Sequence, residues 1–317
     1  MKKALITGIS GFVGSHLTEY LLAQRITILG ITHPEAKFDN LKSVIKKIEI
    51  ESCNVLNKNH LRKILKKQNF DYVFHLAAFP SPQQSFEDPK STLENNIIGQ
   101  LNLLEVLSKE KSKAKILIVG SSEEYGNVDK QNSSVDEKVP LNPITPYAVS
   151  KVAQDFLGLQ YFLHRNLKIV RVRPFNHIGP RQSTAFVVPS FASQIAKIEN
   201  KGIGTIHVGN LDSWRDFTDV RDICSAYFLA LEKGKLGEVY NIGSQKAYKI
   251  SNILKKLISF SNAQVKIVKD KKFSQKTDVK KIICDASKFK LDTGWRAKIS
   301  IETSLFDTME YERRKYK

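Results

Sequence analysis

A tyrosine and a lysine four residues apart have the types and the spacing that proton-transfer chemistry needs. Tyr147 and Lys151 lie in the stretch 140–162, where Thr145 followed by Pro146 is typical of a helix N-terminus. On a helix the two side chains project from the same face. A nearby cation favours the phenolate and lowers the tyrosine's pKa from its usual value near ~10, so the pair predicts proton transfer. The same spacing arises by chance in a lysine-rich chain, which leaves a purely structural role open.

A glycine-rich turn near the N-terminus predicts a nucleotide site that would serve this pair. Residues 2–7 have the apolar pattern of a buried strand, and Gly8, Gly11 and Gly14 follow directly, before an apolar helix that continues to Leu22. Strand, glycine turn and helix together are the context of a dinucleotide fingerprint. Gly8 permits the tight turn, Gly11 lets the backbone approach a pyrophosphate, and Gly14 allows close packing of helix and strand. The helix N-terminus would supply amides and its dipole to the phosphates.

The elements that must position these residues alternate along the first half of the chain. Short apolar runs predict strands at 26–31, 48–50, 72–76, 115–119 and 168–173, with helices at 61–67, 96–107 and 140–162 between them. This alternation predicts an α/β fold with a doubly wound parallel sheet of Rossmann type. We expect a dinucleotide-binding domain over residues 1–175 and a smaller mixed α/β substrate-binding region over 176–317, interleaved with the first. Ligands in such sheets bind beyond the carboxyl ends of the strands, where Ser121 and Glu123 would meet the Tyr147 helix.

The cofactor and metal predictions follow from a few residue types. An NAD-selective site usually has an acidic residue after the second strand, whereas Thr32 and His33 stand there, which favours NADP(H) or the use of both cofactors. The three cysteines, Cys53, Cys224 and Cys284, are scattered without C-x-x-C spacing, and the histidines form no H-x-x-x-H pair. A metal site is therefore not expected.

Composition limits the class of protein. The chain has 317 residues, a net charge of +18 and no apolar run near the ~20 residues that cross a bilayer. No signal-peptide pattern precedes the first strand, so a cytoplasmic location is the expectation. Lysine is dispersed along the chain, which is typical of a solvated surface and favours an anionic substrate. A scaffold that binds RNA without catalysis is the alternative from another class; it would show salt-sensitive binding that does not need Tyr147.

Six short motifs occur in order along the chain and point to one family. They are Gly8-x-x-Gly11-x-x-Gly14, His75-Leu76-Ala77-Ala78, Asn96-x-x-Gly99, Ser121-x-x-x-Tyr125-Gly126, Tyr147-x-x-x-Lys151 and Arg173-Pro174-x-Asn176. Their order and spacing resemble those of the extended short-chain dehydrogenases/reductases, which include sugar-nucleotide epimerases, dehydratases and reductases. The segments GSSEEYG, RPFNHIGPRQ and GNLDSWRDFTDVRD resemble GDP-4-keto-6-deoxymannose reductases. GNLDS-x-RD, the segment SFEDP and the run Ser121-Ser122-Glu123 also resemble GDP-mannose 4,6-dehydratases and related GDP-sugar dehydratases.

The resemblance implies a role for each catalytic candidate. Tyr147 would remove the proton of the sugar C4 hydroxyl as hydride passes to nicotinamide, Lys151 would hold the nicotinamide ribose, and Ser121 would bond the C4 oxygen. Glu123 matches the glutamate with which 4,6-dehydratases remove the C5 proton, although a structural carboxylate also occurs there in reductase-like relatives. A chain that eliminates water needs this further acid/base, whereas a reductase does not.

The resemblance also implies the binding residues. Cofactor contacts are expected from Gly8, Gly11, Phe12, Val13, Gly14, Thr32, His33, Asn54, Val55, Leu76, Ala77, Ala78, Tyr147, Lys151 and Pro174. Substrate contacts are expected from Ser85, Ser122, Asn176, Arg181, Val187 and Arg215. Gln275 stands where relatives carry an arginine, and Lys276 is a possible substitute for it. The resemblance further implies a homodimer, or a dimer of dimers, formed through the Tyr147 helix and its neighbour.

The combined expectation is an NAD(P)-dependent enzyme that acts at C4 of a nucleotide-diphosphate sugar, with GDP as the expected nucleotide. A GDP-sugar 4,6-dehydratase, working by C4 oxidation, loss of water across C5–C6 and hydride return, is the first interpretation. An NAD(P)H-dependent GDP-4-keto-6-deoxyhexose reductase, or a C4 epimerase or dehydrogenase, is the alternative. Glu123 is the residue on which this choice depends.

Overall fold

A seven-stranded parallel sheet forms the centre of the protein. The structure is a computed structural model, and it describes residues 1–128, 134–270 and 281–316. The strands lie in the order β11-β7-β5-β4-β1-β2-β3, and every neighbouring pair is parallel. Their bounds are β1 (Lys3–Thr7), β2 (Thr27–Thr32), β3 (Glu49–Ser52), β4 (Tyr72–His75), β5 (Lys115–Val119), β7 (Lys168–Pro174) and β11 (Val239–Ile242). The α/β fold with a doubly wound parallel sheet is confirmed.

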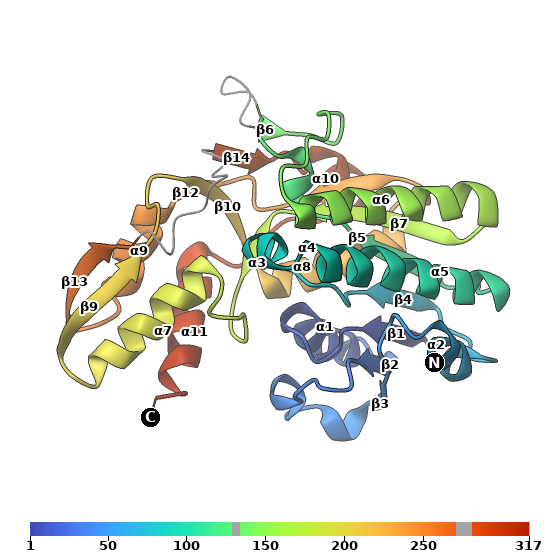
Figure 1. The fold of residues 1–317 in the computed structure, drawn as a ribbon, viewed down its shortest axis with the longest axis horizontal. Helices are drawn as coiled ribbons and strands as arrows, with labels where there is room; N and C mark the ends of the chain where they lie inside the picture. Colours follow the sequence, from blue (N-terminus) through green and yellow to red (C-terminus); the bar gives the residue numbers. More distant parts are fainter. Residues whose placement is uncertain (129–133, 271–280, 317) are drawn as a thin grey trace.

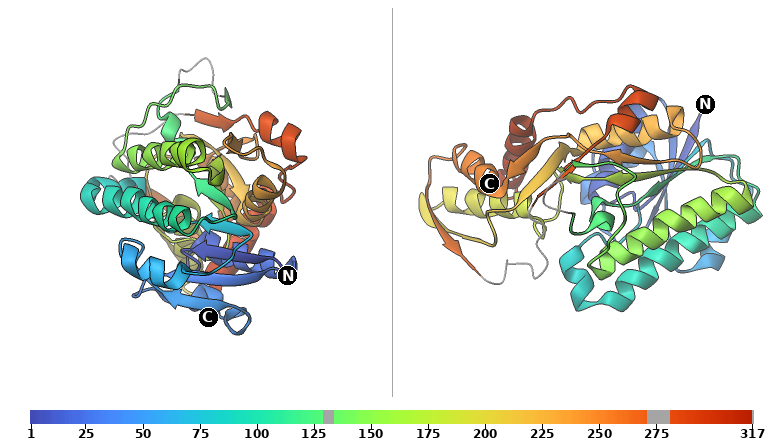
Figure 2. Two further views of the ribbon diagram at one scale, coloured as in Figure 1. Left: turned by 90° about the vertical axis from the view of Figure 1, so that its right-hand side faces the viewer. Right: turned by 90° about the horizontal axis from the view of Figure 1, so that it is seen from above.

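Helices cover both faces of this sheet, as Figures 1 and 2 show. One face packs against α1 (Phe12–Ala23), α8 (Val220–Lys233) and α10 (Ser287–Thr293). The other face packs against α2 (Lys58–Leu65), α5 (Gly99–Lys109) and α6 (Pro146–Arg165). The interior strands are therefore apolar on both sides, which is why they appear in the sequence as continuous hydrophobic runs. None of the helices within the described residues is both long enough and apolar enough to cross a membrane.

A smaller lobe lies beside the sheet, at the left in Figure 1. Its core is formed by α7 (Val187–Glu199), α9 (Ile250–Ile258), α11 (Ile301–Arg313) and the parallel pair β9 (Ile203–Val208) and β13 (Gln264–Lys269). Further short strands are β6 (Ser134–Val135), β8 (Asn176–Ile178), β10 (Trp214–Asp219), β12 (Ala247–Lys249) and β14 (Lys281–Cys284). The remaining short elements are α3 (Pro82–Glu87), α4 (Pro89–Leu93), a π-helical turn at Glu94–Ile98 and 3-10 turns at Asp39–Leu41, Ile45–Lys47 and Ser122–Tyr125.

The C-terminal half of the chain returns to the large sheet. β11 pairs with β7, and α8 packs against α1, so the large core draws on residues from both predicted regions. The boundary at residue 175 stays a prediction. Strand β10 was not predicted, because its sequence WRDFTD looks like a polar loop. Asp216 is nevertheless fully buried, where its carboxylate accepts hydrogen bonds from the backbone of Ser244 and Cys284, and this pairing makes its burial tolerable.

The turn between β1 and α1 has the geometry that its glycines allow. Gly8 has a φ of 73°, in the left-handed region that disfavours other residues. A Cβ on Gly14 would lie 2.3 Å from the carbonyl oxygen of Gly8, so any side chain there would push the helix away from the strand. The first turn of α1 therefore sits directly above the end of β1.

Candidate active site

A cavity of about 450 Å³ opens beyond the carboxyl ends of β1, β4, β5 and β7. Fifteen of the residues predicted to act in catalysis or binding line it: Gly8, Gly11, Phe12, Val13, Gly14, Leu76, Ala78, Ser121, Ser122, Glu123, Tyr147, Lys151, Pro174, Asn176 and Arg181. They come from distant parts of the chain, and the parallel sheet brings them to one edge. The glycine turn and the Tyr147–Lys151 pair thus belong to one site.

The helix that carries Tyr147 is held at its N-terminus by three side chains. The Thr145 hydroxyl accepts a hydrogen bond from the backbone N–H of Ala148 at 2.9 Å, as predicted for an N-cap. The buried Ser85 hydroxyl accepts the N–H of Tyr147 at 3.1 Å. Asn96, in the π-helical turn, donates to the Ser150 hydroxyl at 2.9 Å. Tyr147 therefore sits at a helix end whose position is strongly determined.

Burial dominates the protonation of the tyrosine and the lysine. Burial raises the pKa of Tyr147 above its ordinary value, a hydrogen bond with Ser121 lowers it, and the nearby Glu123 raises it further. The Lys151 ammonium lies 5.8 Å from the centre of the tyrosine ring and donates to the Val119 carbonyl at 3.0 Å. Burial also lowers the pKa of Lys151 to about 8. For the protein chain by itself, desolvation of the phenolate is the largest influence on the pKa of Tyr147. A lowering of that pKa by Lys151 stays a prediction.

Ser121 and Glu123 lie in the turn that follows β5. Ser121 is 7% exposed, and its hydroxyl accepts the N–H of Glu123 at 3.1 Å. This hydroxyl also hydrogen-bonds the Tyr147 phenol, and since it has a single proton, it can donate either to the phenol or to a ligand oxygen in the cavity. Glu123 and Ser122 face the same cavity. The fold thus places a hydroxyl, a phenol and a carboxylate around one space.

The glycine turn and a loop from the second half of the chain fit a dinucleotide. The loop contacts the first turns of α1, because His177 stacks on Phe12 and the Pro180 carbonyl bonds His16 Nε2 at 2.9 Å. Arg181 pairs with Glu19 of α1 at 2.7 Å, while its Nη1 is buried without a hydrogen-bond partner among the described residues. A guanidinium that lines the same cavity as the glycine turn suits the diphosphate of a dinucleotide.

Several predicted residues lie outside the lining of this cavity. Thr32 is buried and bonds the Ser10 hydroxyl at 2.7 Å, and Asn54 accepts the N–H of Leu56 at 2.9 Å. His33, Val55, Ala77, Ser85, Val187 and Arg215 are also absent from the lining. Their predicted ligand contacts stay predictions. Gln275 and Lys276 fall outside the described residues.

Other residues line the cavity without having been assigned a role from the sequence. Asn40 reaches it from the turn after β2 and bonds the Ser10 carbonyl at 3.0 Å. Phe175, His177, Gln182, Ser183, Phe186 and Tyr227 also contribute. The RPFNHIGPRQ segment was a usable signal for His177 and Gln182. Asn40 and Tyr227 had none, because each reaches the cavity only through the packing of its helix or turn.

His75 also lines the cavity without a role assigned from the sequence, and its hydrogen bonds indicate which ring nitrogen carries the proton. Its Nδ1 lies 2.8 Å from the Thr7 hydroxyl, and that hydroxyl also accepts the N–H groups of Leu76 and Ala77, both at 3.2 Å. The hydroxyl proton is therefore directed to Nδ1, which assigns the ring proton to Nε2. Burial lowers the pKa of His75 to about 3, so the ring is neutral.

Comparisons with known proteins agree with this geometry. The GDP-mannose 4,6 dehydratase family profile matches residues 5–308. The chain is 32% identical to the GDP-6-deoxy-D-mannose reductase of Pseudomonas aeruginosa, over 96% of this chain and 95% of that protein. It is 30% identical to GDP-mannose 4,6 dehydratase 1 of Arabidopsis thaliana, over 95% and 87% of the two chains.

Among solved structures, RMD from Pseudomonas aeruginosa complexed with NADPH superposes with a TM-score of 0.87. The match is 31% identical and covers 99% of this chain and 100% of that one. The fold, the cavity at the end of the parallel strands and the full-length matches lead to one conclusion. The chain belongs to the GDP-mannose 4,6 dehydratase family of extended short-chain dehydrogenases/reductases, enzymes that modify nucleotide sugars.

Proposed function

We propose that the protein is an NAD(P)H-dependent reductase of a GDP-linked 4-keto-6-deoxyhexose. The observation that carries this proposal is the place of Tyr147, a buried phenol that lines the cavity beside the Ser121 hydroxyl and whose burial favours the protonated form. A protonated phenol can donate to a ketone oxygen, as the reduction of a C4 carbonyl requires. The full-length similarity to a GDP-6-deoxy-D-mannose reductase also supports it.

The residues of the chain have distinct tasks in this reaction. Tyr147 donates its proton to the C4 oxygen as negative charge develops there, and the Ser121 hydroxyl stabilises that charge by a second hydrogen bond. Lys151, fixed at the carbonyl of Val119, contributes positive charge behind the phenol. The nicotinamide, when bound, supplies the hydride to C4. Among the described residues, no group of three or more His, Cys, Asp or Glu side chains could hold a metal ion.

Cofactor binding falls to the glycine turn and the adjoining loop. Gly8, Gly11 and Gly14 bring the backbone and the start of α1 to the diphosphate. Arg181, which the sequence assigned to substrate, is instead proposed to bind that diphosphate, because its guanidinium lies along α1. The absence of an acidic residue at Thr32 favours NADPH over NADH. Asn176 and Arg215 remain the proposed contacts of the sugar-linked diphosphate.

A 4,6-dehydratase is the second candidate, and Glu123 favours it. Its carboxylate lies in the same cavity as Ser121 and Tyr147, where it could remove a proton from C5. Two incubations separate the candidates. Consumption of NADPH with a GDP-4-keto-6-deoxyhexose, and no conversion of GDP-mannose without added reductant, supports the reductase. Formation of a 4-keto-6-deoxy product from GDP-mannose without reductant would establish the dehydratase instead.

We also propose that the protein is a homodimer formed through α6. Val149, Phe156 and Leu163 recur every seven residues along this helix and are 45%, 51% and 59% exposed. Spacing of seven places them on one stripe of the helix surface, and an exposed apolar stripe is typical of an interface. A second copy of the same helix, related by a two-fold axis, would cover the stripe with matching side chains.

A further inference from the structure

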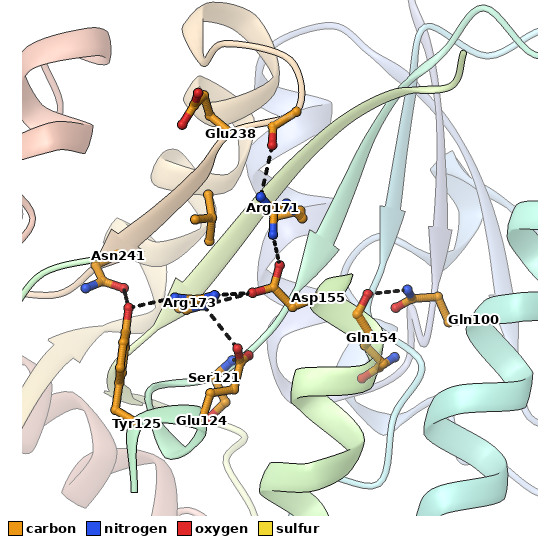
Figure 3. A network of polar contacts seen from close by, with 12 residues as sticks. Gln100, Ser121, Glu124, Tyr125, Gln154, Asp155, Arg171, Arg173, Glu238 and Asn241 are labelled. Atoms are coloured by element: carbon orange, nitrogen blue, oxygen red, sulfur yellow. Dashed lines mark hydrogen bonds and ion pairs between the residues drawn. The ribbon is translucent and has the colours of Figure 1, made fainter. Parts of the chain in front are cut away.

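A buried network of polar groups connects the turn that carries Ser121 with the helix that carries Tyr147. Glu124 Oε1 accepts a hydrogen bond from the Ser121 backbone N–H at 2.7 Å, and its Oε2 lies 3.0 Å from Arg173 Nε. Arg173 in turn donates from Nη2 to Asp155 Oδ2 at 2.6 Å. Asp155 belongs to α6, as does Tyr147. Figure 3 shows this path from the Ser121 turn across Arg173 to the helix.

The members of this network have little freedom to move. Glu124 is fully buried and Asp155 is 1% exposed. Asp155 also accepts from Arg171 at 2.6 Å, and Arg173 donates from Nη1 to the Tyr125 hydroxyl at 3.0 Å. Buried ionic groups that lose a partner are strongly destabilised, so the arrangement is held as a unit.

Gly120 leaves room for the carboxyl group of Glu124. A Cβ on Gly120 would lie 2.1 Å from Glu124 Oε1, so the glycine is needed where the carboxyl reaches back over the turn. Burial and the neighbouring Asp155 raise the pKa of Glu124 to about 8, against the lowering effect of Arg173. Either protonation state leaves Oε1 as the acceptor for Ser121, because a carboxylic acid retains acceptor oxygens.

We propose that Glu124 is a positioning residue that sets the separation between the Ser121 hydroxyl and the Tyr147 phenol. Its carboxyl accepts a hydrogen bond from the backbone N–H of Ser121. The same carboxyl contacts Arg173, and Arg173 pairs with Asp155 on the helix that carries Tyr147. Glu124 itself is absent from the cavity lining. Its neighbour Glu123 faces the cavity, so two adjacent glutamates have separate tasks. The effect of Glu124 on turnover rests on the proposed function, whereas its effect on the geometry does not.

The first test compares crystal structures of Glu124→Leu and Glu124→Gln. Leucine removes the acceptor, so we expect Ser121 Oγ to move by about 1 Å or more relative to Tyr147 Oη. Glutamine keeps an acceptor oxygen of the same reach, so Ser121 should stay in place. An unmoved Ser121 in Glu124→Leu would overturn the proposal, and this readout requires no activity. Should Glu124→Leu not fold, Gly120→Ala provides the same displacement by forcing the carboxyl away.

The second test measures turnover. Glu124→Leu should lower kcat by about 10²-fold with KM and the Kd for NADPH nearly unchanged, and Glu124→Gln should restore most of the loss. In a Ser121→Ala background the effect of Glu124→Leu should disappear, because Glu124 acts through Ser121. Equal losses in the leucine and glutamine variants would contradict the proposal. Glu312→Gln changes a buried carboxyl of α11 that pairs with Lys315 outside this network; it is the matched control and should leave kcat unchanged.

If the wild-type protein converts no GDP-sugar, the proposed function fails while the crystallographic comparison still decides the role of Glu124.

Discussion

Lys151 donates a hydrogen bond of 3.0 Å to the backbone carbonyl of Val119, at the last residue of β5. This bond joins the Tyr147 helix to the strand that leads into the Ser121 turn. It also holds the ammonium inside the protein, where the side chain is 4% exposed. The two halves of the catalytic arrangement are therefore joined twice, here and through Glu124.

Replacement of this lysine should change the pH dependence of stability. Burial lowers the pKa of Lys151 to about 8 in the folded protein, from 10.5 in the reference state. Between these values the unfolded chain binds a proton that the folded chain does not, so wild-type stability rises with pH over this range. Relative to Lys151→Met, the wild-type free energy of unfolding should increase by roughly 3 kcal/mol from pH 7 to pH 10.5. Urea unfolding of both proteins across this range measures their free energies of unfolding. If these free energies change equally with pH in the two proteins, the lowered pKa of Lys151 is contradicted.

Loss of the phenol should abolish turnover without loss of cofactor binding. Removal of a proton donor typically lowers kcat by about 10²–10⁴-fold, so Tyr147→Phe should lose this much with an unchanged Kd for NADPH. Tyr161→Phe is the matched control, because Tyr161 is buried on the same helix and absent from the cavity lining. Steady-state kinetics on the keto sugar tests the prediction, and a Tyr147→Phe variant with normal kcat would exclude the tyrosine as the donor.

Glu123→Gln should distinguish reduction from dehydration. A reductase takes its proton from Tyr147, so the variant should retain kcat within about threefold of the wild type. A dehydratase would lose activity by about 10²-fold or more, because the group that accepts the C5 proton is absent. Product analysis with GDP-mannose and with a keto sugar gives the two rates for each protein.

Arg181→Ala should weaken binding of the cofactor. Arg181 lines the cavity, and its Nη1 has no hydrogen-bond partner among the described residues. Loss of a charged hydrogen bond to phosphate costs about 1.5–3 kcal/mol, or roughly 10- to 100-fold in Kd. Fluorescence titration with NADPH measures the affinity, and the variant should also show a weaker dependence on salt. Arg62→Ala removes a surface arginine that pairs with Glu110 and serves as control. An unchanged Kd in Arg181→Ala would contradict a cofactor contact and leave the substrate contact expected from the sequence.

Phe156→Glu should convert the proposed homodimer into a monomer. The side chain lies at the middle of the exposed stripe on α6, where a buried carboxylate without a partner would be strongly unfavourable. Light scattering after size-exclusion chromatography gives the mass of each species. Phe306→Glu changes a comparably exposed phenylalanine on α11 and should leave the mass unchanged. A wild-type protein that elutes as a monomer would contradict the proposed interface.

The sequence by itself determined the features that depend on neighbours in the chain. The glycine turn before α1, the capped start of α6 at Thr145 and the spacing of Tyr147 and Lys151 follow from local backbone rules and helical periodicity. The parallel sheet followed as well, because strands buried on both faces appear as uninterrupted apolar runs.

Only the tertiary structure decided what depends on distant partners. Glu123 and Glu124 are identical neighbours in the sequence, yet one faces the cavity and the other is buried against Arg173 of β7. Strand β10 needed partners for its buried Asp216, and the pKa of Tyr147 depended on how completely the fold desolvates it. The physical reason is common to all three: burial and pairing of a polar group are set by elements far away in the chain, which local patterns do not encode.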